Sequence, residues 1–250
     1  MKKNTALAFA LLALAFGILA CGSIQIGGAG DGERIMGSGP VIEEDRDVSG
    51  VSGVELAMQG TLHVSMGSTT TLRIEAQENL MEYIETDVNG STLVIHNTPG
   101  YDLRSTRPIQ YYLTVEKLDN IEVSSSGDIE VGNLTSDSLS IRSNSSGDIA
   151  IDGLDGSALE VKISSSGELE ISGGQIQEQR IDISSSGDYQ AGDLASASAD
   201  IDLTSSGSAT VQVSDRLRGR LSSSGNIYYI GDPEVDVRTT SSGKVTQIDQ

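Results

Sequence analysis

The sequence predicts an all-β, single-domain protein whose main part is a parallel β-helix, or β-solenoid, with coils of about 20 residues. Apolar and polar side chains alternate along short segments, which is the pattern of a strand with one buried face. A Ser-Ser-Ser-Gly element, which we interpret as a turn, recurs after residue 120 at spacings of 20, 20, 20, 20, 18 and 18 residues, with glycines at Gly127, Gly147, Gly167, Gly187, Gly207, Gly225 and Gly243. In several coils a second corner follows this turn, as at Gly132-Asn133-Leu134.

The first 20 residues are predicted to be a lipoprotein signal peptide. Lys2 and Lys3 precede an uncharged apolar run that ends at Ala20 and is short for a stable transmembrane helix. The sequence Ile18-Leu19-Ala20-Cys21-Gly22 resembles the lipobox of bacterial lipoproteins, in which the cysteine is acylated and begins the mature chain. The resemblance implies lipid attachment at Cys21, membrane contact through that lipid and an extracytoplasmic place in the cell envelope. An ordinary signal peptide beside an unrelated cysteine is the alternative.

Residues 21–40 are predicted to be a flexible tether, because seven glycines fall between residues 22 and 40 and apolar periodicity is weak there. The folded domain is then expected to cover residues 41–250. Its first part, 41–120, is predicted to form N-terminal coils or a cap, and its second part, 121–250, contains the Ser-Ser-Ser-Gly repeats. Cys21 is the only cysteine, so the chain has no internal disulfide.

The segment 41–120 has strand patterns but lacks the repeated motif. Leu80 and Ile84 lie on one face of one or two helical turns at 78–84, and Asn89-Gly90 predicts a tight hairpin. Since an open solenoid end invites strand pairing, this segment is expected to cover the end. Alternating apolar residues predict its strands around residues 54–58, 62–66, 72–76, 93–95 and 109–115.

Within each repeat, the alternation places the middle serine and the glycine inside the coil, for example Ser165 and Gly167. Small residues there permit a tight bend or a close approach of two backbones, and the serines are expected to form a hydrogen-bonded ladder. Opposite charges one coil apart favour stacking in register. Residues five before each glycine form the column Glu122, Arg142, Lys162, Asp182, Asp202, Arg220 and Arg238. Residues seven before it form the column Asn120, Ser140, Glu160, Arg180, Asp200, Arg218 and Asp236.

The position directly after the motif glycine forms an acidic column, which consists of Asp128, Asp148, Glu168 and Asp188. These carboxylates do not neutralise one another. One interpretation is a solvated face on which Asp side chains accept hydrogen bonds from the turn backbone. The alternative is a row that recruits Ca²⁺ or a basic partner, although the chain has no EF-hand loop and no nonapeptide calcium repeat.

Several segments inside and outside the repeats share a family likeness. They are residues 48–64, the strand Leu72-Arg73-Ile74-Glu75-Ala76, Leu93-Val94-Ile95, and the repeated Ser-Ser-Gly-Asp/Asn-Ile, as in Gly225-Asn226-Ile227. Together they resemble the bacterial head GIN domain family, over about residues 41–247. The resemblance implies a secreted or lipid-anchored β-helical envelope protein with an adhesive, interaction or scaffold role and with no catalytic residues to transfer.

The composition excludes several function classes. A net charge of −20 opposes binding to nucleic acid. The chain has no Gly-x-Ser-x-Gly element, and His63 and His96 are expected on polar strand faces without a shared metal site. The sequence therefore predicts no catalytic residue, no metal and no cofactor. The expected partner is an unidentified protein or glycan of the envelope or cell exterior, and the edge of the last coil favours self-association.

Two other functions are open alternatives. A calcium- or glycan-binding module would use the acidic column or exposed aromatic rings, for which the candidates are Tyr101, Tyr112, Tyr228 and Tyr229. A polysaccharide-cleaving β-helix enzyme would combine Arg142 or Lys162 as a base with a cation near Asp148 and Glu168. The single basic cluster, Arg216, Arg218 and Arg220, is expected to pair with Asp200, Asp202 and Asp236.

Overall fold

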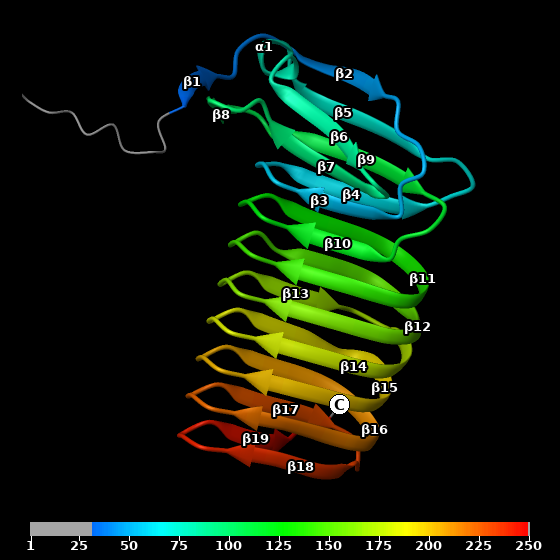
Figure 1. Cartoon of the computed structure of the whole chain (residues 1–250), viewed down its shortest axis with the longest axis vertical. Coiled ribbons are helices and arrows are strands. Elements are labelled where there is room, and N and C mark those ends of the chain that lie inside the picture. Colours follow the sequence, from blue (N-terminus) through cyan, green and yellow to red (C-terminus); the bar gives the residue numbers. More distant parts are fainter. Residues whose placement is uncertain (1–31, 250) are drawn as a thin grey trace, which may run out of the picture. The chain divides into compact units, whose positions relative to one another are not determined.

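The computed structural model describes residues 32–249, so the predicted signal peptide, Cys21 and part of the predicted tether lie outside the described residues. The described chain forms one column of stacked strands with a smaller cap at one end (Figure 1). This architecture confirms the predicted all-β solenoid. Between residues 32 and 249, no helix has the length and apolar composition needed to cross a membrane.

The column consists of parallel strands that pair from coil to coil. The Ser-Ser-Ser-Gly turns stack along one edge (Figure 1). Along the other edge, long strands bend through the predicted second corner without a break, as β11 does at Gly132. The strands are β3 (Gly53–Leu56), β4 (Thr61–Met66), β10 (Asn120–Val123), β11 (Asp128–Ser143), β12 (Ile149–Ile163), β13 (Glu168–Ile171), β14 (Gly174–Ile183), β15 (Asp188–Leu203), β16 (Ser208–Leu221), β17 (Asn226–Ile230), β18 (Glu234–Thr239) and β19 (Lys244–Gln247).

The cap adds antiparallel strands to the end of the column. It contains β2 (Val41–Arg46), β5 (Thr71–Gln77), helix α1 (Glu78–Met81), β6 (Ile84–Asn89), β7 (Thr92–Asn97) and β9 (Gln110–Val115). β7 and β9 continue the column by pairing in parallel with β3 and β4. In contrast, β5 pairs antiparallel with β2 and β9, and β6 pairs antiparallel with β7. The predicted hairpin is present, but its turn lies one residue later than expected, at Gly90 and Ser91: Asn89 pairs with Thr92, and Gly90 has a φ of +67°.

The predicted start of the folded domain at residue 41 is too late. Residues Glu33–Met36 form β1, which pairs in parallel with β8 (Tyr101–Arg104). β1 lies inside the segment 21–40 that the sequence predicts to be a tether. β1 escaped prediction because its polar and exposed residues show no apolar alternation, and because its partner lies about 70 residues away along the chain.

The core is a double row of aliphatic side chains between the two faces of each coil. In β11, Ile129 and Val131 come from one face and Leu139 and Ile141 from the other, and each is at most 3% exposed. Each stacks directly on an aliphatic residue of β12, which are Ile149, Ile151, Leu159 and Val161. Burial of these side chains supplies the main stabilisation of the stack.

The motif glycines allow successive turns to touch one another. A Cβ atom placed on Gly187 would lie 2.6 Å from the carbonyl oxygen of Gly167 and 2.6 Å from Cγ2 of Ile163. The middle serines bind the turn before them: Ser145 donates a hydrogen bond from its hydroxyl to the carbonyl oxygen of Ser125, and Ser241 does the same to Ser223. The predicted close approach of the backbones is therefore confirmed, and the predicted serine ladder is present at these turns.

The change in repeat length from 20 to 18 residues is absorbed at the second corner. Between β15 and β16 the pairing register shifts between Ala191 and Ala195 and again between Ser196 and Ser198. On either side the pairing is regular, since Tyr189 pairs with Ala209 and Ile201 pairs with Gly219. Both faces of the coil thus keep their stacking while the corner becomes shorter.

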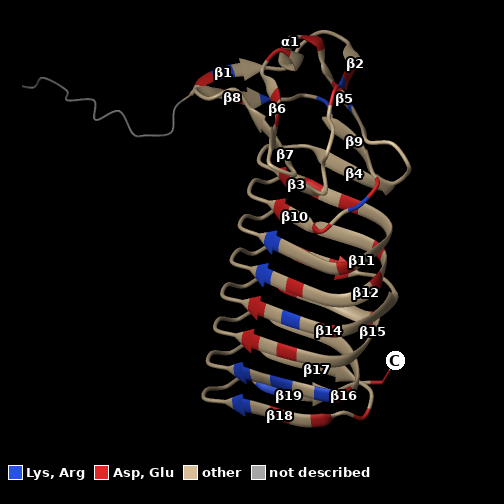
Figure 2. Ribbon diagram, turned by 45° about the vertical axis from the view of Figure 1, so that its right-hand side comes forward, with Lys and Arg blue, Asp and Glu red and all other residues tan. Residues whose placement is uncertain are grey.

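The registers place the charged columns as the sequence predicts, and their bands of opposite sign are visible along the strands (Figure 2). Arg180 sits beside Asp200, with 3.7 Å between Nη1 and Oδ2. Lys162 does not pair with Asp182, its neighbour in the column on the next coil. Its Nζ instead lies 2.5 Å from Oε1 of Glu160, two residues earlier on its own strand. Such exposed pairs contribute about 0 to 1 kcal/mol each, so the columns specify register more than they stabilise the fold.

Candidate functional site

The acidic column lies directly after the stacked turns, where its carboxylates accept hydrogen bonds from the next coil. Oδ1 of Asp128 accepts from the backbone N–H of Asp148 at 3.0 Å, and Oδ1 of Asp148 accepts from that of Glu168 at 2.8 Å. Oδ1 of Asp188 accepts from the N–H of Ser208 at 2.8 Å. These contacts agree with the turn-capping interpretation of the aspartates. Recruitment of Ca²⁺ or a basic partner by the same column stays a prediction.

Glu168 is the member of this column whose negative charge is least favourable in the folded chain. Partial desolvation of this largely exposed carboxyl raises its pKa above the usual value, and the neighbouring charges of Asp148, Asp188 and Glu170 raise it further. A raised pKa means that the folded chain holds this proton more tightly than the unfolded chain does. The charged form of Glu168 therefore destabilises the fold above the usual pKa range, and this cost disappears as the pH falls below it.

Replacing Glu168 with glutamine is expected to raise the free energy of unfolding at pH 7 by less than about 1 kcal/mol, because the side chain is exposed and its charge is screened. The gain over the wild-type chain should vanish below pH 4.5, the ordinary carboxyl pKa. Urea unfolding at both pH values measures this. Glu160→Gln is the control: the hydrogen bond from Lys162 lowers the pKa of Glu160, so loss of this carboxylate should lower stability or leave it unchanged. A destabilised E168Q protein at pH 7 would contradict the assignment.

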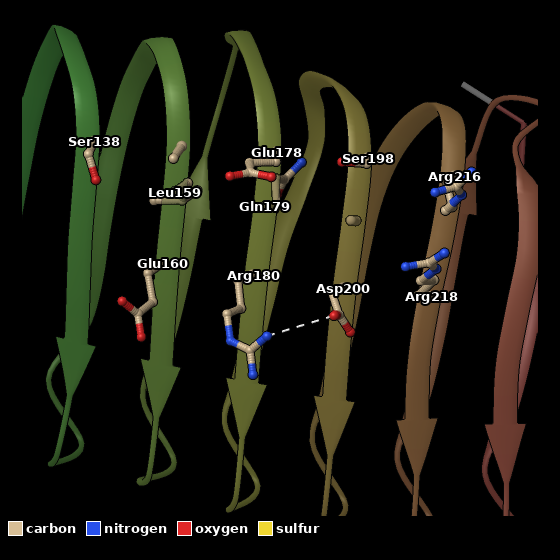
Figure 3. Close-up of a pocket in the computed structure, with 12 residues that line it drawn as sticks. Ser138, Leu159, Glu160, Glu178, Gln179, Arg180, Ser198, Asp200, Arg216 and Arg218 are labelled. Atoms are coloured by element: carbon tan, nitrogen blue, oxygen red, sulfur yellow. Dashed lines mark ion pairs between the residues drawn. The ribbon is translucent and has the colours of Figure 1, made fainter.

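A hollow of about 540 Å³ crosses the outer face of β11, β12, β14, β15 and β16 (Figure 3). Small side chains form part of its lining, among them Ser138, Ala158 and Ser198. Longer charged side chains surround them: Glu160 on β12, Glu178 and Arg180 on β14, Asp200 on β15, and Arg216 and Arg218 on β16. The hollow therefore carries charges of both signs, with two arginines at its end toward the last coil, which suits it to contact an extended polar partner.

The predicted pairing of the basic cluster is wrong for the side chains. In the described part of the chain, Arg216 is the only one of the three arginines with a carboxylate in ion-pair range, and that carboxylate is Glu234 at 4.0 Å. The register does bring Arg218 beside Asp200 and Asp236. Strand register fixes only the Cα positions, however, and Asp200 is bound by Arg180 instead.

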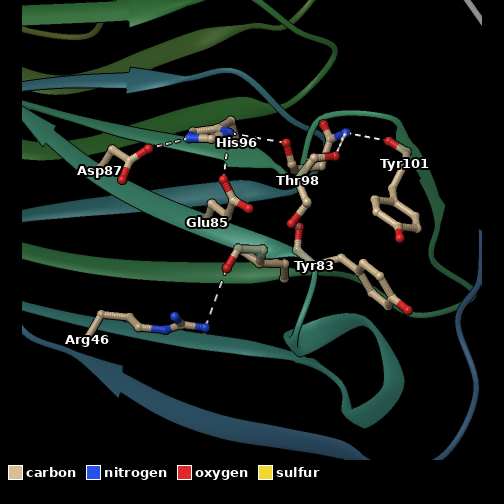
Figure 4. A network of polar contacts seen from close by, with 9 residues as sticks. Arg46, Tyr83, Glu85, Asp87, His96, Thr98 and Tyr101 are labelled. Carbon is tan, nitrogen blue, oxygen red and sulfur yellow. Dashed lines mark hydrogen bonds and ion pairs between the residues drawn. The ribbon is translucent and has the colours of Figure 1, made fainter. Parts of the chain in front are cut away.

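The two histidines lie in separate polar clusters, as expected. His63 on β4 has Oε2 of Glu130 3.0 Å from its Nδ1 and Oε1 of Gln110 2.6 Å from its Nε2. His96 on β7 has Oδ2 of Asp87 2.9 Å from its Nε2 and Oε2 of Glu85 3.9 Å from its Nδ1 (Figure 4). Burial lowers the pKa of His96, but hydrogen bonds with Asp87 and with the Asn97 carbonyl and the charges of Asp87 and Glu85 outweigh burial and raise it overall.

Two of the four aromatic candidates for glycan contact, Tyr101 and Tyr112, pack against other side chains of the protein, whereas Tyr228 and Tyr229 are half-buried on β17. The ring of Tyr112 stacks on His63 at 5.1 Å between ring centroids, and the guanidinium of Arg73 lies 4.7 Å from its centroid. Since these neighbours come from the strands on either side of β9, both ring faces are covered. Tyr101 packs against Tyr83 at 4.7 Å between centroids. Neither ring forms the exposed platform that glycan-binding surfaces commonly use.

The arrangement needed for polysaccharide cleavage is not assembled around Lys162. Its Nζ is bound to Glu160, as described above. Arg142 and Lys162 precede their turns, whereas Asp148 and Glu168 follow the turns on the other face of the coil. The structure therefore does not bring the candidate base and the candidate cation ligands to one point.

The family of this chain is shown by comparison with family models. A family model described as "Putative auto-transporter adhesin, head GIN domain" matches residues 51–233, which is more than half of the chain. The chain belongs to the head GIN domain family. Membership confirms the resemblance found in the sequence, and the family description is that of a cell-surface or envelope protein. No curated protein matches the sequence.

Solved structures share the fold of this head GIN domain. A "putative adhesin" from Bacteroides fragilis has a TM-score of 0.80 and 21% identity, over 86% of this chain and 100% of that chain. A "putative lipid binding protein" from Parabacteroides distasonis has a TM-score of 0.71 and 23% identity, with the same coverage. A "putative adhesin" from Parabacteroides merdae has a TM-score of 0.71 and 19% identity, over 86% and 99%. These likenesses establish the fold, and none of the three proteins is named as an enzyme.

Sequence reasoning missed two polar features of the head GIN domain. The cluster of Glu85, Asp87 and His96 lies on the two strands of the predicted hairpin, but the expected Asn89-Gly90 turn would have placed Glu85 opposite Val94. Glu85 pairs with His96 because the turn consists of Gly90 and Ser91. The second feature is Gln179, which lies inside the coil with Oε1 2.6 Å from the hydroxyl of the buried Tyr189. Its position on the inward face followed from the strand alternation, but its partner, ten residues away across the core, did not.

Proposed function

We propose that this head GIN domain is the exposed part of a lipid-anchored envelope protein, with an adhesive, interaction or scaffold role and no enzymatic activity. The carrying observation is the family match, which describes adhesin-type proteins. The position of β1 supports the proposal, because β1 belongs to the capped end of the column. A lipid on Cys21 would hold the capped end close to the membrane and leave the coils and their charged hollow accessible to a partner.

The reach of this tether is short. Ten residues separate Cys21 from Gly32, where the described body begins. Fully extended, this segment spans at most about 40 Å. The cap would therefore stay near the lipid surface, while the last coils are the most distant part of the body. A surface-bound partner would meet those coils first.

Replacing Cys21 with serine is expected to release the protein from the membrane, because acylation requires the thiol. Bacteria that express the wild-type chain or C21S are fractionated, and the protein is followed by immunoblotting in the membrane, soluble and medium fractions. Wild type should sediment with membranes, and C21S should not. The matched control is Ser23→Ala, which keeps the cysteine and should stay with the membrane.

The interaction role is tested in the same strains. Whole cells carrying the wild-type chain should adhere to envelope or matrix preparations better than cells carrying C21S, whose protein has left the surface. If C21S remains in the membrane fraction, the lipid anchor is wrong. If both strains adhere equally although C21S is released, the adhesive role is wrong and the anchor stands.

A further inference from the structure

Three metal-ligating side chains converge on the hairpin of β6 and β7. Glu85 on β6 pairs directly with His96 on β7, and Asp87 lies two residues further along β6 on the same face. One ligand atom from each of the three residues lies within 4.8 Å of the other two. The side chains of His96 and Glu85 are 23% and 40% exposed, so an ion can reach them from solvent. Figure 4 shows both carboxylates turned toward the imidazole.

The hydrogen bonds of His96 determine which ring nitrogen is free. Nδ1 lies 3.1 Å from the backbone carbonyl oxygen of Asn97. A carbonyl oxygen only accepts hydrogen bonds, so Nδ1 donates to Asn97 and Nε2 is the nitrogen that an ion can use. Nε2 lies 2.9 Å from Oδ2 of Asp87. A metal ion bound to Nε2 and Asp87 would take the place of the proton that joins them.

We propose that Glu85, Asp87 and His96 form a binding site for a divalent transition-metal ion of the Zn²⁺ type. Imidazole and carboxylate are ligands that Zn²⁺ accepts, and three protein ligands leave a fourth position for water. A histidine that binds metal through one nitrogen commonly donates its other N–H to a backbone carbonyl, which is the arrangement of His96 and Asn97. The site needs only a small opening of the Asp87 to His96 contact and a rotation of the partly exposed Glu85 side chain.

His63 serves as the internal comparison. Its two ring nitrogens face the carboxylate of Glu130 and the side-chain amide of Gln110. His63 therefore has one carboxylate neighbour and one amide neighbour, whereas His96 has two carboxylate neighbours. A neutral amide oxygen is a weaker ligand for Zn²⁺ than a carboxylate. The two histidines are thus similar in exposure and in having an acidic neighbour, and they differ in the number of anionic ligands.

A bound ion would also have a structural effect. β6 pairs with β7 along its whole length, from Ile84 to Asn89. An ion held by both strands would cross-link β6 to β7, and the thermal stability of the cap should rise with the Zn²⁺ concentration.

The test is a titration of the purified chain with ZnCl₂, followed by calorimetry, with Co²⁺ absorption as a second readout of ligand geometry. The wild-type chain should bind one ion. His96→Ala should abolish this binding, and Glu85→Gln and Asp87→Asn should each weaken it by about 10-fold or more. His63→Ala should bind as the wild type does. Far-UV circular dichroism checks that each variant is folded.

Three outcomes would overturn the site. The first is a wild-type chain that binds no Zn²⁺ at millimolar concentration. The second is a His96→Ala protein that binds as tightly as the wild type, and the third is equal binding by the Asp87→Asn protein. If His96→Ala fails to fold, the two conservative carboxylate variants decide the question, because each keeps the size of its side chain.

Discussion

Replacing Gly187 with alanine is expected to lower the free energy of unfolding by about 3 kcal/mol, because the added methyl group has no space. Its carbon would lie 2.6 Å from the carbonyl oxygen of Gly167 and 2.8 Å from that of Ser165, both in the preceding turn. These are backbone atoms, and they are held by the coils on either side. The coil can accommodate the methyl group only by moving two stacked turns apart. Urea or thermal unfolding of the full chain measures the loss.

Gly132→Ala is the matched control for this prediction. Gly132 is also in a coil, but a Cβ atom there would meet no atom closer than the carbonyl oxygen of Val64 at 3.9 Å. Alanine should therefore change stability by no more than about 0.5 kcal/mol. If G187A and G132A proved equally stable, the close contact between the turns would not be a constraint on the fold.

The second large effect is expected at the polar pair inside the column. The hydroxyl of Tyr189 donates to Oε1 of Gln179 at 2.6 Å, and both residues are at most 2% exposed. Nε2 of Gln179 is buried without a hydrogen-bond acceptor. Tyr189→Phe leaves the whole amide unpartnered, and Gln179→Leu leaves the tyrosine hydroxyl unpartnered. Each change is expected to cost about 1 to 3 kcal/mol.

The double variant Q179L/Y189F should recover most of this loss or exceed the stability of the wild type. It removes every polar atom of the pair, including the unpartnered Nε2, and leucine is the residue that occupies the same position in the preceding coil as Leu159. Equilibrium unfolding of the four proteins gives the coupling free energy directly. If the double variant lost as much as the two single changes combined, the pair would not be coupled across the core.

Much of the fold was predictable because the sequence repeats. A regular spacing between motif glycines implies that each coil lies on a copy of itself, and this alone determines which residues pair, such as Glu122 with Arg142. The small inward residues of the turn were predictable for the same reason. β1 was not, because it pairs with β8, whose sequence it does not resemble and whose position no repeat indicates.

Less of the candidate sites could be predicted, because they depend on side-chain conformation. The column register placed Arg218 beside Asp200, yet Asp200 pairs with Arg180, on the strand on its other side. The hollow likewise depends on where small residues such as Ala158 and Ser198 interrupt columns of longer ones. The register that brings Glu85 beside His96 was not predictable either, since the turn lies at Gly90 and Ser91, one residue after the expected Asn89-Gly90.

The strands of the solenoid run across the column, and neighbouring coils are joined by backbone hydrogen bonds that lie along it. Tension applied between the capped end and the last coil therefore acts along these hydrogen bonds. The bonds of one coil then break a few at a time, whereas bonds loaded in shear would have to break together. One detached coil of 18 residues, the length of the last two repeats, lengthens the chain by about 60 Å, while the column loses only about 5 Å of height. Under such a load the coils are expected to detach in steps from the last coil toward the cap, so the last coils absorb extension before the cap does.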